Sequence, residues 1–186
     1  TVLQREFKSR MIDQTITIVD YGVGNLKSIQ NMLRVLGVDS LVAGNVEVVR
    51  DAKKLLLPGV GAFDYGMKNL VDRGLKELLD FKVEEEQTPI LGICLGAQLM
   101  TRGSEEGKLD GLGWIDADTR KFNSSRLDSL LRVPHMGWAD TTFNHSSDLF
   151  QGTVEMPRYY YVHSYHIVCD RLEDEVCHSH HGYDFV

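Results

Sequence analysis

Apolar and polar positions divide this chain into two parts with different periodicities. From Thr15 to about Gly103, short β-branched apolar runs alternate with segments whose apolar residues recur every three or four positions. That alternation is typical of strands followed by helices. Beyond Gly103 the pattern changes to short strands and turns. We therefore predict an α/β fold with three layers: a doubly wound, mostly parallel central sheet with helices on both faces, and a smaller antiparallel β addition.

The same pattern predicts individual elements. Strands are expected at 15–20, near 40–43, at 53–57 and leading into Cys94, and helices at 26–36, 63–73 and 75–83. Gly37 ends the first helix, because glycine readily adopts the left-handed conformation of a helix C-terminus. Asp20 is placed to cap the turn that follows its strand. Residues 1–14 are polar and lack a clean period, so we interpret them as an extension or tag remnant and 15–186 as one domain.

Composition narrows the classes of function. The 186 residues are 42% hydrophobic, enough for a full core, and carry a formal net charge of −7, which argues against a nucleic-acid or anionic-membrane surface. Three cysteines are an odd number and do not indicate a disulfide framework. No apolar run approaches the ~20 residues of a membrane span. We expect a soluble, cytoplasmic domain that binds neither nucleic acid nor membrane.

The pentapeptide Gly92-Ile93-Cys94-Leu95-Gly96 places a cysteine between an apolar strand and a helical pattern. G-x-C-x-G has the form of a nucleophile elbow, in which the reactive residue lies on a tight, strained strand-to-helix turn. The glycines are needed because neighbouring backbone passes close to them. The helix start favours a thiolate, and the Leu95 N–H becomes a candidate oxyanion donor. A buried structural cysteine is the alternative that five residues alone leave open.

A glycine-rich turn, Pro58-Gly59-Val60-Gly61, follows the predicted strand 53–57. It therefore lies at the carboxyl end of a strand, where open α/β sheets place their sites. Glycines allow backbone N–H groups to point at an anionic oxygen. Such a turn is usually only a strand-to-helix connection, but together with the Cys94 elbow it suggests the other half of an oxyanion hole.

Four motifs, LPGVGAF (57–63), GICLGAQL (92–99), PHMGW (134–138) and YYYVHSYH (159–166), carry a family resemblance. In this order they are similar to the class I (triad) glutamine amidotransferases and, more narrowly, to the glutaminase subunits of imidazole glycerol phosphate synthase. The likeness covers roughly 16–186 and implies a flavodoxin-like amidotransferase domain with no cofactor or metal. Such a subunit hydrolyses L-glutamine to glutamate and ammonia. A (β/α)8-barrel cyclase partner uses the ammonia to make imidazole glycerol phosphate and an aminoimidazole carboxamide ribotide in histidine biosynthesis.

The resemblance also implies roles for individual residues. Cys94 would attack the glutamine carboxamide, and the oxyanion would lie between the Leu95 N–H and one from Gly59, Val60 or Gly61. For the substrate, Gln98 would bind glutamine, and backbone around His163, Ser164 and Tyr165 would hold its amino and carboxylate groups. Asn25 of YGVGN and Trp138 of PHMGW would face the barrel partner.

The family completes its triad with a His and a Glu in a motif of the form FHPE, and the printed sequence ends at Val186 before any such motif. We expect these residues in a further C-terminal segment. A chain without them is expected to show no glutaminase activity, because the thiol would lack its general base.

Several other residues invite a functional interpretation. A zinc site is conceivable at Cys169, Cys177, His178, His180 and His181, but the spacing C-x7-C-H-x-H-H matches no compact zinc knuckle, so edge-strand histidines are favoured. Tyrosines 159–161 are predicted to be strand core rather than a stacking platform. Residues 84–86, all Glu, are predicted to be a solvated helix end. His135 stays open between a partner contact and a core histidine.

Two alternative functions accompany the histidine-pathway hypothesis. A paralogous amidotransferase subunit could supply ammonia for sugar amidation in surface-polysaccharide biosynthesis. The stretches SYHIVCD and GYDFV, and Ala139 after Trp138, favour that branch. The other alternative is a non-catalytic binding or regulatory subunit with the same fold.

Overall fold

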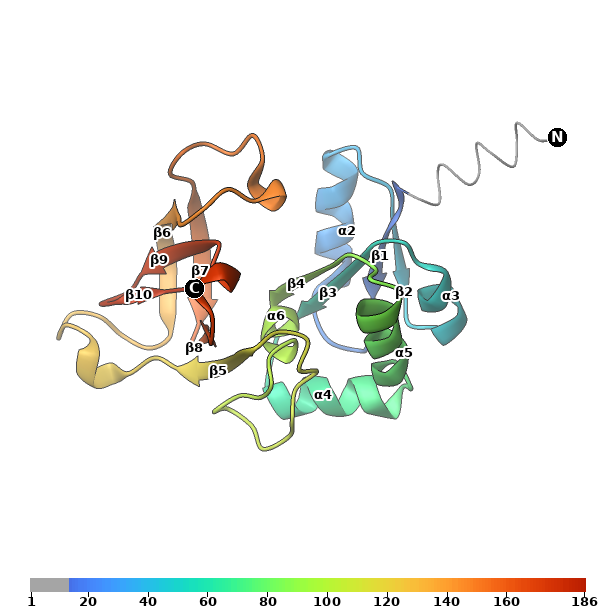
Figure 1. The fold of residues 1–186 in the computed structure, drawn as a ribbon, viewed down its shortest axis with the longest axis horizontal. Helices are drawn as coiled ribbons and strands as arrows, with labels where there is room; N and C mark the ends of the chain where they lie inside the picture. The colour runs from blue at the N-terminus through green and yellow to red at the C-terminus, as the bar shows by residue number, and fades with distance from the viewer. Residues whose placement is uncertain (1–13) are drawn as a thin grey trace.

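The chain folds into two halves built around different kinds of sheet, as a computed structural model of residues 14–186 shows (Figure 1). The first half is a parallel sheet covered by helices. The second half is antiparallel and follows a long irregular connection. This architecture confirms the predicted fold class, α/β with an antiparallel addition.

The parallel sheet has four strands and positions the candidate site. Its strands are β1 (Ile16–Val19), β2 (Ser40–Ala43), β3 (Leu55–Gly59) and β4 (Ile90–Cys94), in the order β2-β1-β3-β4. Its helical segments are α2 (Leu26–Val35), α3 (Val46–Asp51), α4 (Phe63–Asp72), α5 (Lys76–Asp80), the π-helical turn η1 (Phe81–Glu85) and α6 (Leu95–Leu99). In Figure 1, α2 lies on the opposite side of the sheet from α4 and α5, so the sheet is covered on both faces.

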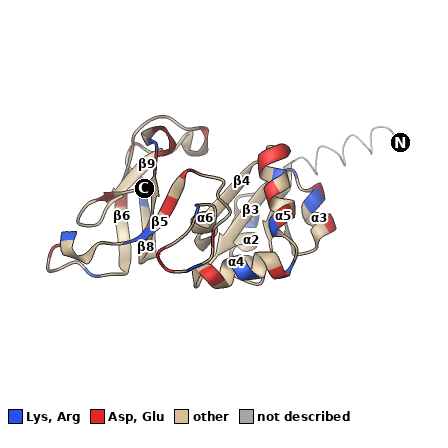
Figure 2. Cartoon of the chain, turned by 60° about the horizontal axis from the view of Figure 1, so that its bottom comes forward, with Lys and Arg blue, Asp and Glu red and all other residues tan. Residues whose placement is uncertain are grey.

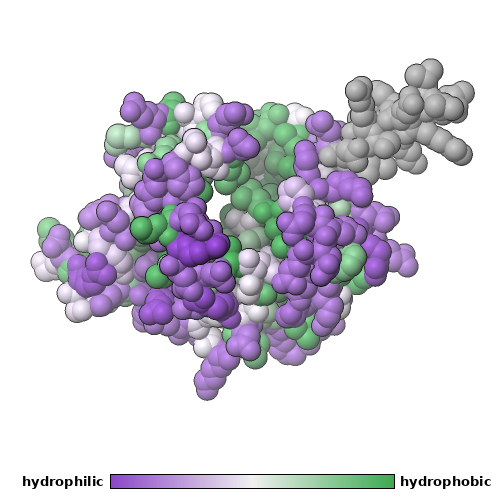
Figure 3. All heavy atoms as spheres, in the orientation of Figure 1, coloured by the Kyte–Doolittle hydropathy of each residue, from purple (hydrophilic) through white to green (hydrophobic). Residues whose placement is uncertain are grey.

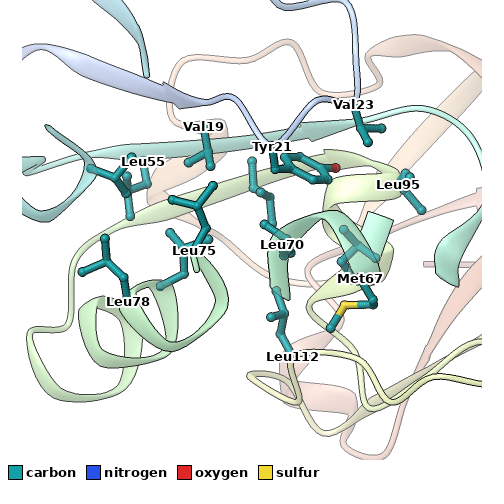
Figure 4. Packing of buried hydrophobic residues seen from close by; sticks show 14 of the residues in the cluster. Val19, Tyr21, Val23, Leu55, Met67, Leu70, Leu75, Leu78, Leu95 and Leu112 are labelled. Atoms are coloured by element: carbon teal, nitrogen blue, oxygen red, sulfur yellow. The ribbon is translucent and has the colours of Figure 1, made fainter. Parts of the chain in front are cut away.

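The main core lies between the sheet and helices α3 to α6. Leu57, Phe63, Leu70 and Leu79 are completely buried there, and each such side chain stabilises the fold by roughly 1.5–3 kcal/mol relative to exposure. Figure 4 shows the Tyr21 ring lying across this cluster. The opposite face of the sheet is covered less completely, because none of the residues of α2 is fully buried.

Some predicted boundaries moved and one helix was missed. The strand expected at 53–57 runs from Leu55 to Gly59, since Lys53 and Lys54 are exposed and precede the buried run. Helix α3 was not predicted because its sequence is rich in valine, which disguises helical periodicity. Its start signal was nevertheless present: Asn45 caps it, accepting hydrogen bonds from the N–H groups of Glu47 and Val48.

The acidic run 84–86 also differs in detail from a simple solvated helix end. The last turn before it is π-helical, and all three glutamates are exposed. Glu86 nevertheless forms a 2.8 Å ion pair with Lys82, whose side chain is buried and also donates to the Arg50 carbonyl. The hydrogen bond between Lys82 and Glu86 lowers the pKa of Glu86. The buried ammonium thereby joins the π-helical turn to α3.

The antiparallel half contains six strands. They are β5 (Ala117–Lys121), β6 (His135–Phe143), β7 (Arg158–His163), β8 (Tyr165–Cys169), β9 (Cys177–His180) and β10 (Asp184–Phe185). One sheet has the order β10-β9-β6-β7, and β5 pairs with β8. Short 3₁₀ turns occupy Ser124–Arg126, Asp148–Phe150 and Leu172–Asp174.

A histidine-rich aromatic core fills this half. Phe122 is 2% exposed, and its ring centroid lies 4.8–6.3 Å from the rings of His135, His163, His166 and His181. His135 and His181 are themselves buried and stack at 4.2 Å. His135, left open by the sequence, is therefore a core histidine.

The tyrosine run 159–161 lies on β7, as expected of a strand, but its assignment to the core was wrong. Tyr159 and Tyr160 are 38% and 55% exposed, and only Tyr161 turns toward the histidine core, where its ring stacks on His135 at 5.0 Å. Strand alternation turns Tyr160 to the face of β7 opposite Tyr161, and that face is open, whereas Tyr159 shares the face of Tyr161 and is still partly exposed.

The remaining sequence hypotheses are answered by local contacts. Asp20 accepts a hydrogen bond from the Gly22 N–H at 2.9 Å, so it caps its turn as predicted. His178 and His180 hydrogen-bond to acidic side chains. Within residues 14–186, His, Cys, Asp and Glu side chains form no group of three that could hold a metal ion. Over the same part of the chain, the helices are too short or too polar to cross a membrane. Acidic and basic side chains are interspersed over α3, α4 and α5 (Figure 2).

The Cys94 turn yields a first prediction about stability. A Cβ on Gly96 would lie 1.8 Å from the Leu57 carbonyl oxygen, so Gly96→Val forces β3 and α6 apart. We expect the free energy of unfolding, measured in urea, to fall by about 3 kcal/mol or more. Gly103→Ala is the matched control, because the nearest heavy atom to its Cβ would be 4.0 Å away. Equal unfolding midpoints for the two variants would contradict the close approach.

The histidine core predicts sensitivity to acid. Burial, with smaller contributions from His181 and His163, lowers the pKa of His135 to about 4. The unfolded chain, with a histidine pKa near 6.5, therefore binds more protons than the folded chain between pH 6.5 and 4, and stability falls as pH drops through that window. Between pH 7 and 5 we expect His135 alone to remove on the order of 2 kcal/mol.

Urea unfolding of the wild type and of His135→Leu at both pH values measures this contribution. The variant should lose less stability than the wild type on acidification. An identical pH dependence in the two proteins would show that His135 is protonated equally in the folded and unfolded states.

Candidate active site

The Cys94 turn joins the end of β4 directly to the start of α6. Cys94 has φ +53° and ψ −117°, a conformation that non-glycine residues adopt only when the surrounding structure enforces it. Both flanking glycines are sterically required: a Cβ on Gly92 would lie 2.6 Å from the Ala97 Cα, and one on Gly96 would meet the Leu57 carbonyl. The turn predicted from G-x-C-x-G is present, and Cys94 lies exposed at its apex.

The glycine-rich turn lies beside it. Gly59 pairs with Cys94 in the parallel register of β3 and β4. A Cβ on Gly59 would be 2.8 Å from the Gly96 nitrogen, and Gly61 has φ +114°. Among the described residues no hydrogen bond uses the N–H of Val60 or Gly61. The structure thus brings together Cys94, Leu95 and the Gly59–Gly61 segment, with backbone donors available next to the thiol.

Three residues that the sequence reasoning missed hold the glycine-rich turn, 58–61, at its two ends. Upstream, the buried Tyr21 hydroxyl donates to the Pro58 carbonyl at 2.7 Å, and burial together with the nearby Cys94 raises the tyrosine pKa. Downstream, the Glu106 carboxylate accepts from the Phe63 N–H at 2.9 Å, at the start of α4. Asp64 accepts hydrogen bonds from two N–H groups of the loop that carries Glu106. Only Tyr21 had a sequence signal, because it begins the YGVGN stretch that follows the first strand.

A cavity of about 360 Å³ opens at the thiol and contains most of the expected substrate-binding groups. Cys94, Gln98, His163 and Tyr165 line it. The Gln98 side-chain amide donates to the Tyr165 carbonyl at 3.5 Å, so α6 and the antiparallel half meet here. Ser164 lies between two lining residues, and its carbonyl accepts from the Phe122 N–H at 3.0 Å. A larger cavity, about 870 Å³, lies among residues 142–156 and includes none of the predicted site residues.

The two residues expected at a partner interface lie outside the cavity. Asn25 is exposed, and its side chain caps α2 by accepting from the Ser28 N–H. Trp138 is 63% exposed on β6, where its ring meets the Tyr160 ring edge-on at 5.7 Å. Cross-strand partners Met136 and Val162 are exposed beside them. Figure 3 shows apolar residues gathered in the hollow between the two halves.

The three cysteines differ in environment. Cys169 and Cys177 are half-buried, and burial raises the pKa of both thiols. Cys94 is exposed, and among residues 14–186 no side chain hydrogen-bonds to its sulfur. Of the three, Cys94 alone combines access to a cavity, a strained turn and adjacent backbone donors.

Comparisons with known proteins agree with this geometry. The family model "Glutamine amidotransferase class-I" matches residues 17–184. "Imidazole glycerol phosphate synthase subunit HisH 2" of Methanococcus maripaludis is 47% identical over 155 residues, which cover 83% of this chain and 75% of that protein. Subunit HisH of Sulfurimonas denitrificans is 42% identical over 171 residues, covering 91% and 82%. Subunit HisH 2 of Pseudomonas aeruginosa is 41% identical over 170 residues, covering 91% and 83%.

Solved structures show the same fold at lower sequence identity. A glutamine amidotransferase crystal structure superposes with a TM-score of 0.62 at 16% identity, over 84% of this chain and 74% of that one. PurLQS from Thermotoga maritima gives a TM-score of 0.63 at 19% identity, over 91% and 77%. The family match, the relatives and the Cys94 turn agree, and the chain belongs to the class-I glutamine amidotransferases.

Proposed function

We propose that this protein is the glutaminase subunit of an imidazole glycerol phosphate synthase. It hydrolyses L-glutamine to glutamate and ammonia and passes the ammonia to a (β/α)8-barrel cyclase partner in histidine biosynthesis. The observation that carries the proposal is the placement of Cys94: a strained turn holds its thiol at a cavity, beside unused backbone N–H groups. Relatives at 41–47% identity bear the name of this synthase subunit. Reduced thiols at all three cysteines fit the cytoplasm.

The chemistry follows from these positions. The Cys94 thiolate attacks the carboxamide carbon of glutamine, and the negative charge that develops on oxygen is stabilised by the Leu95 N–H and by one from the Gly59–Gly61 segment. The C–N bond breaks as nitrogen takes a proton, which releases ammonia and leaves a γ-glutamyl thioester. Water then cleaves the thioester to glutamate. The family resemblance assigns these proton transfers to the histidine and glutamate of the family's triad.

Substrate binding is assigned to the wall of the cavity opposite the thiol. Gln98 lies one helical turn after Cys94, and its amide hydrogen-bonds to the backbone of the 163–165 segment. Gln98, His163 and Tyr165 line the cavity at the thiol, and Ser164 lies between the last two in sequence. Those groups would bind the amino and carboxylate ends of glutamine.

The partner surface is assigned to Asn25 and Trp138. The exposed apolar side chains around Trp138, on one face of β6 and β7, provide the large aromatic area that protein interfaces favour. Asn25 lies in the turn between β1 and α2, at the carboxyl edge of the same sheet that carries Cys94. Tyr160, against which the Trp138 ring packs, lines the cavity at Cys94.

Replacing the nucleophile tests the central claim. In the complex with its barrel partner, Cys94→Ala should reduce glutamine-dependent product formation by at least about 10³-fold while synthesis from added ammonium salt continues, because the partner needs only ammonia. Cys177→Ala is the matched control and should retain both activities. Retained glutamine turnover in Cys94→Ala would refute the assignment.

The same assay identifies the acceptor. Product formation is measured with the imidazole-forming ribonucleotide substrate and, separately, with a sugar-amidation partner and its sugar substrate. Glutamine-dependent turnover only with the sugar system would replace the histidine-pathway assignment by the paralogous one. Cys94 would keep its role in either case.

Gln98 should affect binding more than chemistry. Gln98→Ala removes a group from the cavity wall, so the KM for glutamine should rise roughly tenfold with kcat changed by less than about threefold. Alkylation of Cys94 by iodoacetamide, followed by mass spectrometry, should proceed at the wild-type rate. An unchanged KM would remove Gln98 from the glutamine-binding site.

A further inference from the structure

A continuous hydrogen-bonded path runs from the histidine core into the candidate glutamine site. His135 and His163 face each other across β6 and β7, with Nδ1 of the first 3.1 Å from Nε2 of the second. The other ring nitrogen of His163 lies 2.8 Å from the Tyr165 carbonyl oxygen. That same oxygen accepts the hydrogen bond from the Gln98 amide. The path therefore links a buried residue of β6 to two groups that line the cavity.

The Tyr165 carbonyl fixes the direction of each hydrogen bond in the path. A carbonyl oxygen only accepts, so the Nδ1 of His163 must carry a proton and donate to Tyr165. In the neutral ring Nε2 is then an acceptor, which requires His135 to donate from its own Nδ1. Burial lowers the pKa of both imidazoles, so both are neutral at pH 7. The Nδ1–H tautomer of each ring satisfies both imidazole hydrogen bonds of the path.

The surroundings hold His135 in place. Its ring stacks on His181 at 4.2 Å and on Tyr161 at 5.0 Å, and His181 is tied by its Nε2 to the Arg132 carbonyl at 2.9 Å. His135 does not line the cavity, whereas His163 does. A residue so packed can orient the His163 ring without touching substrate.

We propose that His135 is a positioning residue for glutamine binding: its Nδ1–H orients the His163 ring, which holds the Tyr165 carbonyl and, through it, the side-chain amide of Gln98. With one N–H directed at the Tyr165 carbonyl, the Gln98 amide presents its oxygen and its second N–H to substrate. The proposal rests on the proposed glutaminase function and adds a residue to it.

Kinetics of the full protein with its barrel partner test the path. His135→Leu replaces the imidazole by an apolar side chain of similar size and removes the donor. His135→Asn retains an N–H near the position of Nδ1. Loss of one oriented hydrogen bond is expected to raise the KM for glutamine about tenfold in His135→Leu, with kcat changed by less than about threefold. His135→Asn should keep the KM within about threefold of the wild type. His178→Asn, on β9 outside the cavity, is the matched control and should match the wild type.

Other outcomes overturn the proposal. Equal KM values in His135→Leu and the wild type, or equal losses in His135→Leu and His135→Asn, would mean that His135 only packs. Those results leave Cys94-dependent glutaminase activity intact, so they are distinguishable from failure of the proposed function, in which Cys94→Ala would retain turnover.

A spectroscopic measurement needs no variant. Imidazole ¹⁵N chemical shifts at pH 7.5 should show both His135 and His163 as neutral Nδ1–H tautomers. An Nε2–H tautomer at His163 would break the path at the Tyr165 carbonyl and overturn the proposal.

Discussion

The contact between β3 and α6 is the constraint on which the candidate site depends. The Leu57 carbonyl passes so close to Gly96 that even a methyl group cannot fit between them, and Gly59 leaves equally little space next to Leu95 and Gly96. This approach allows the chain to turn within one residue at Cys94, at the cost of a backbone conformation that cysteine rarely adopts. The same approach places the N–H groups of one turn beside the thiol of the other. Loosening it would move the thiol away from the proposed oxyanion donors.

The substrate cavity arises where the two halves of the molecule meet. The parallel half supplies Cys94 and Gln98 from one strand-turn-helix unit, and the antiparallel half supplies the 163–165 segment from the junction of β7 and β8. The second half has a core of imidazole and aromatic rings around Phe122 rather than of aliphatic side chains. Rings with directional hydrogen bonds fix orientation more tightly than aliphatic packing does, and His163 holds the Tyr165 carbonyl of the cavity wall in this way.

Features of the fold and site that depend on neighbouring residues could be predicted from the sequence, whereas features that depend on distant contacts could not. The Cys94 turn, the glycine-rich turn and the alternation of strands and helices followed from short patterns, because each depends on neighbouring residues. Helix α3 was missed since its valines resemble a strand. The exposure of Tyr160 depends on which face of β7 the rest of the fold covers. The contacts of Tyr21, Glu106 and His135 join residues far apart in sequence, and no local pattern encodes such partners. The role of each predicted site residue stays a prediction.

The Tyr21 phenol holds one side of the site by a bond that acid cannot break. Because burial raises its pKa, the hydroxyl stays protonated, and therefore remains a donor to the Pro58 carbonyl, at neutral and acidic pH. The opposite wall is held by His135 and His163, and because burial lowers the pKa of both, these imidazoles gain charge only in acid. A drop in pH would thus act unequally on the two sides: the Pro58 turn keeps its hydrogen bond while the wall formed by residues 163–165 loosens. Acidification would then deform the cavity from the antiparallel side alone.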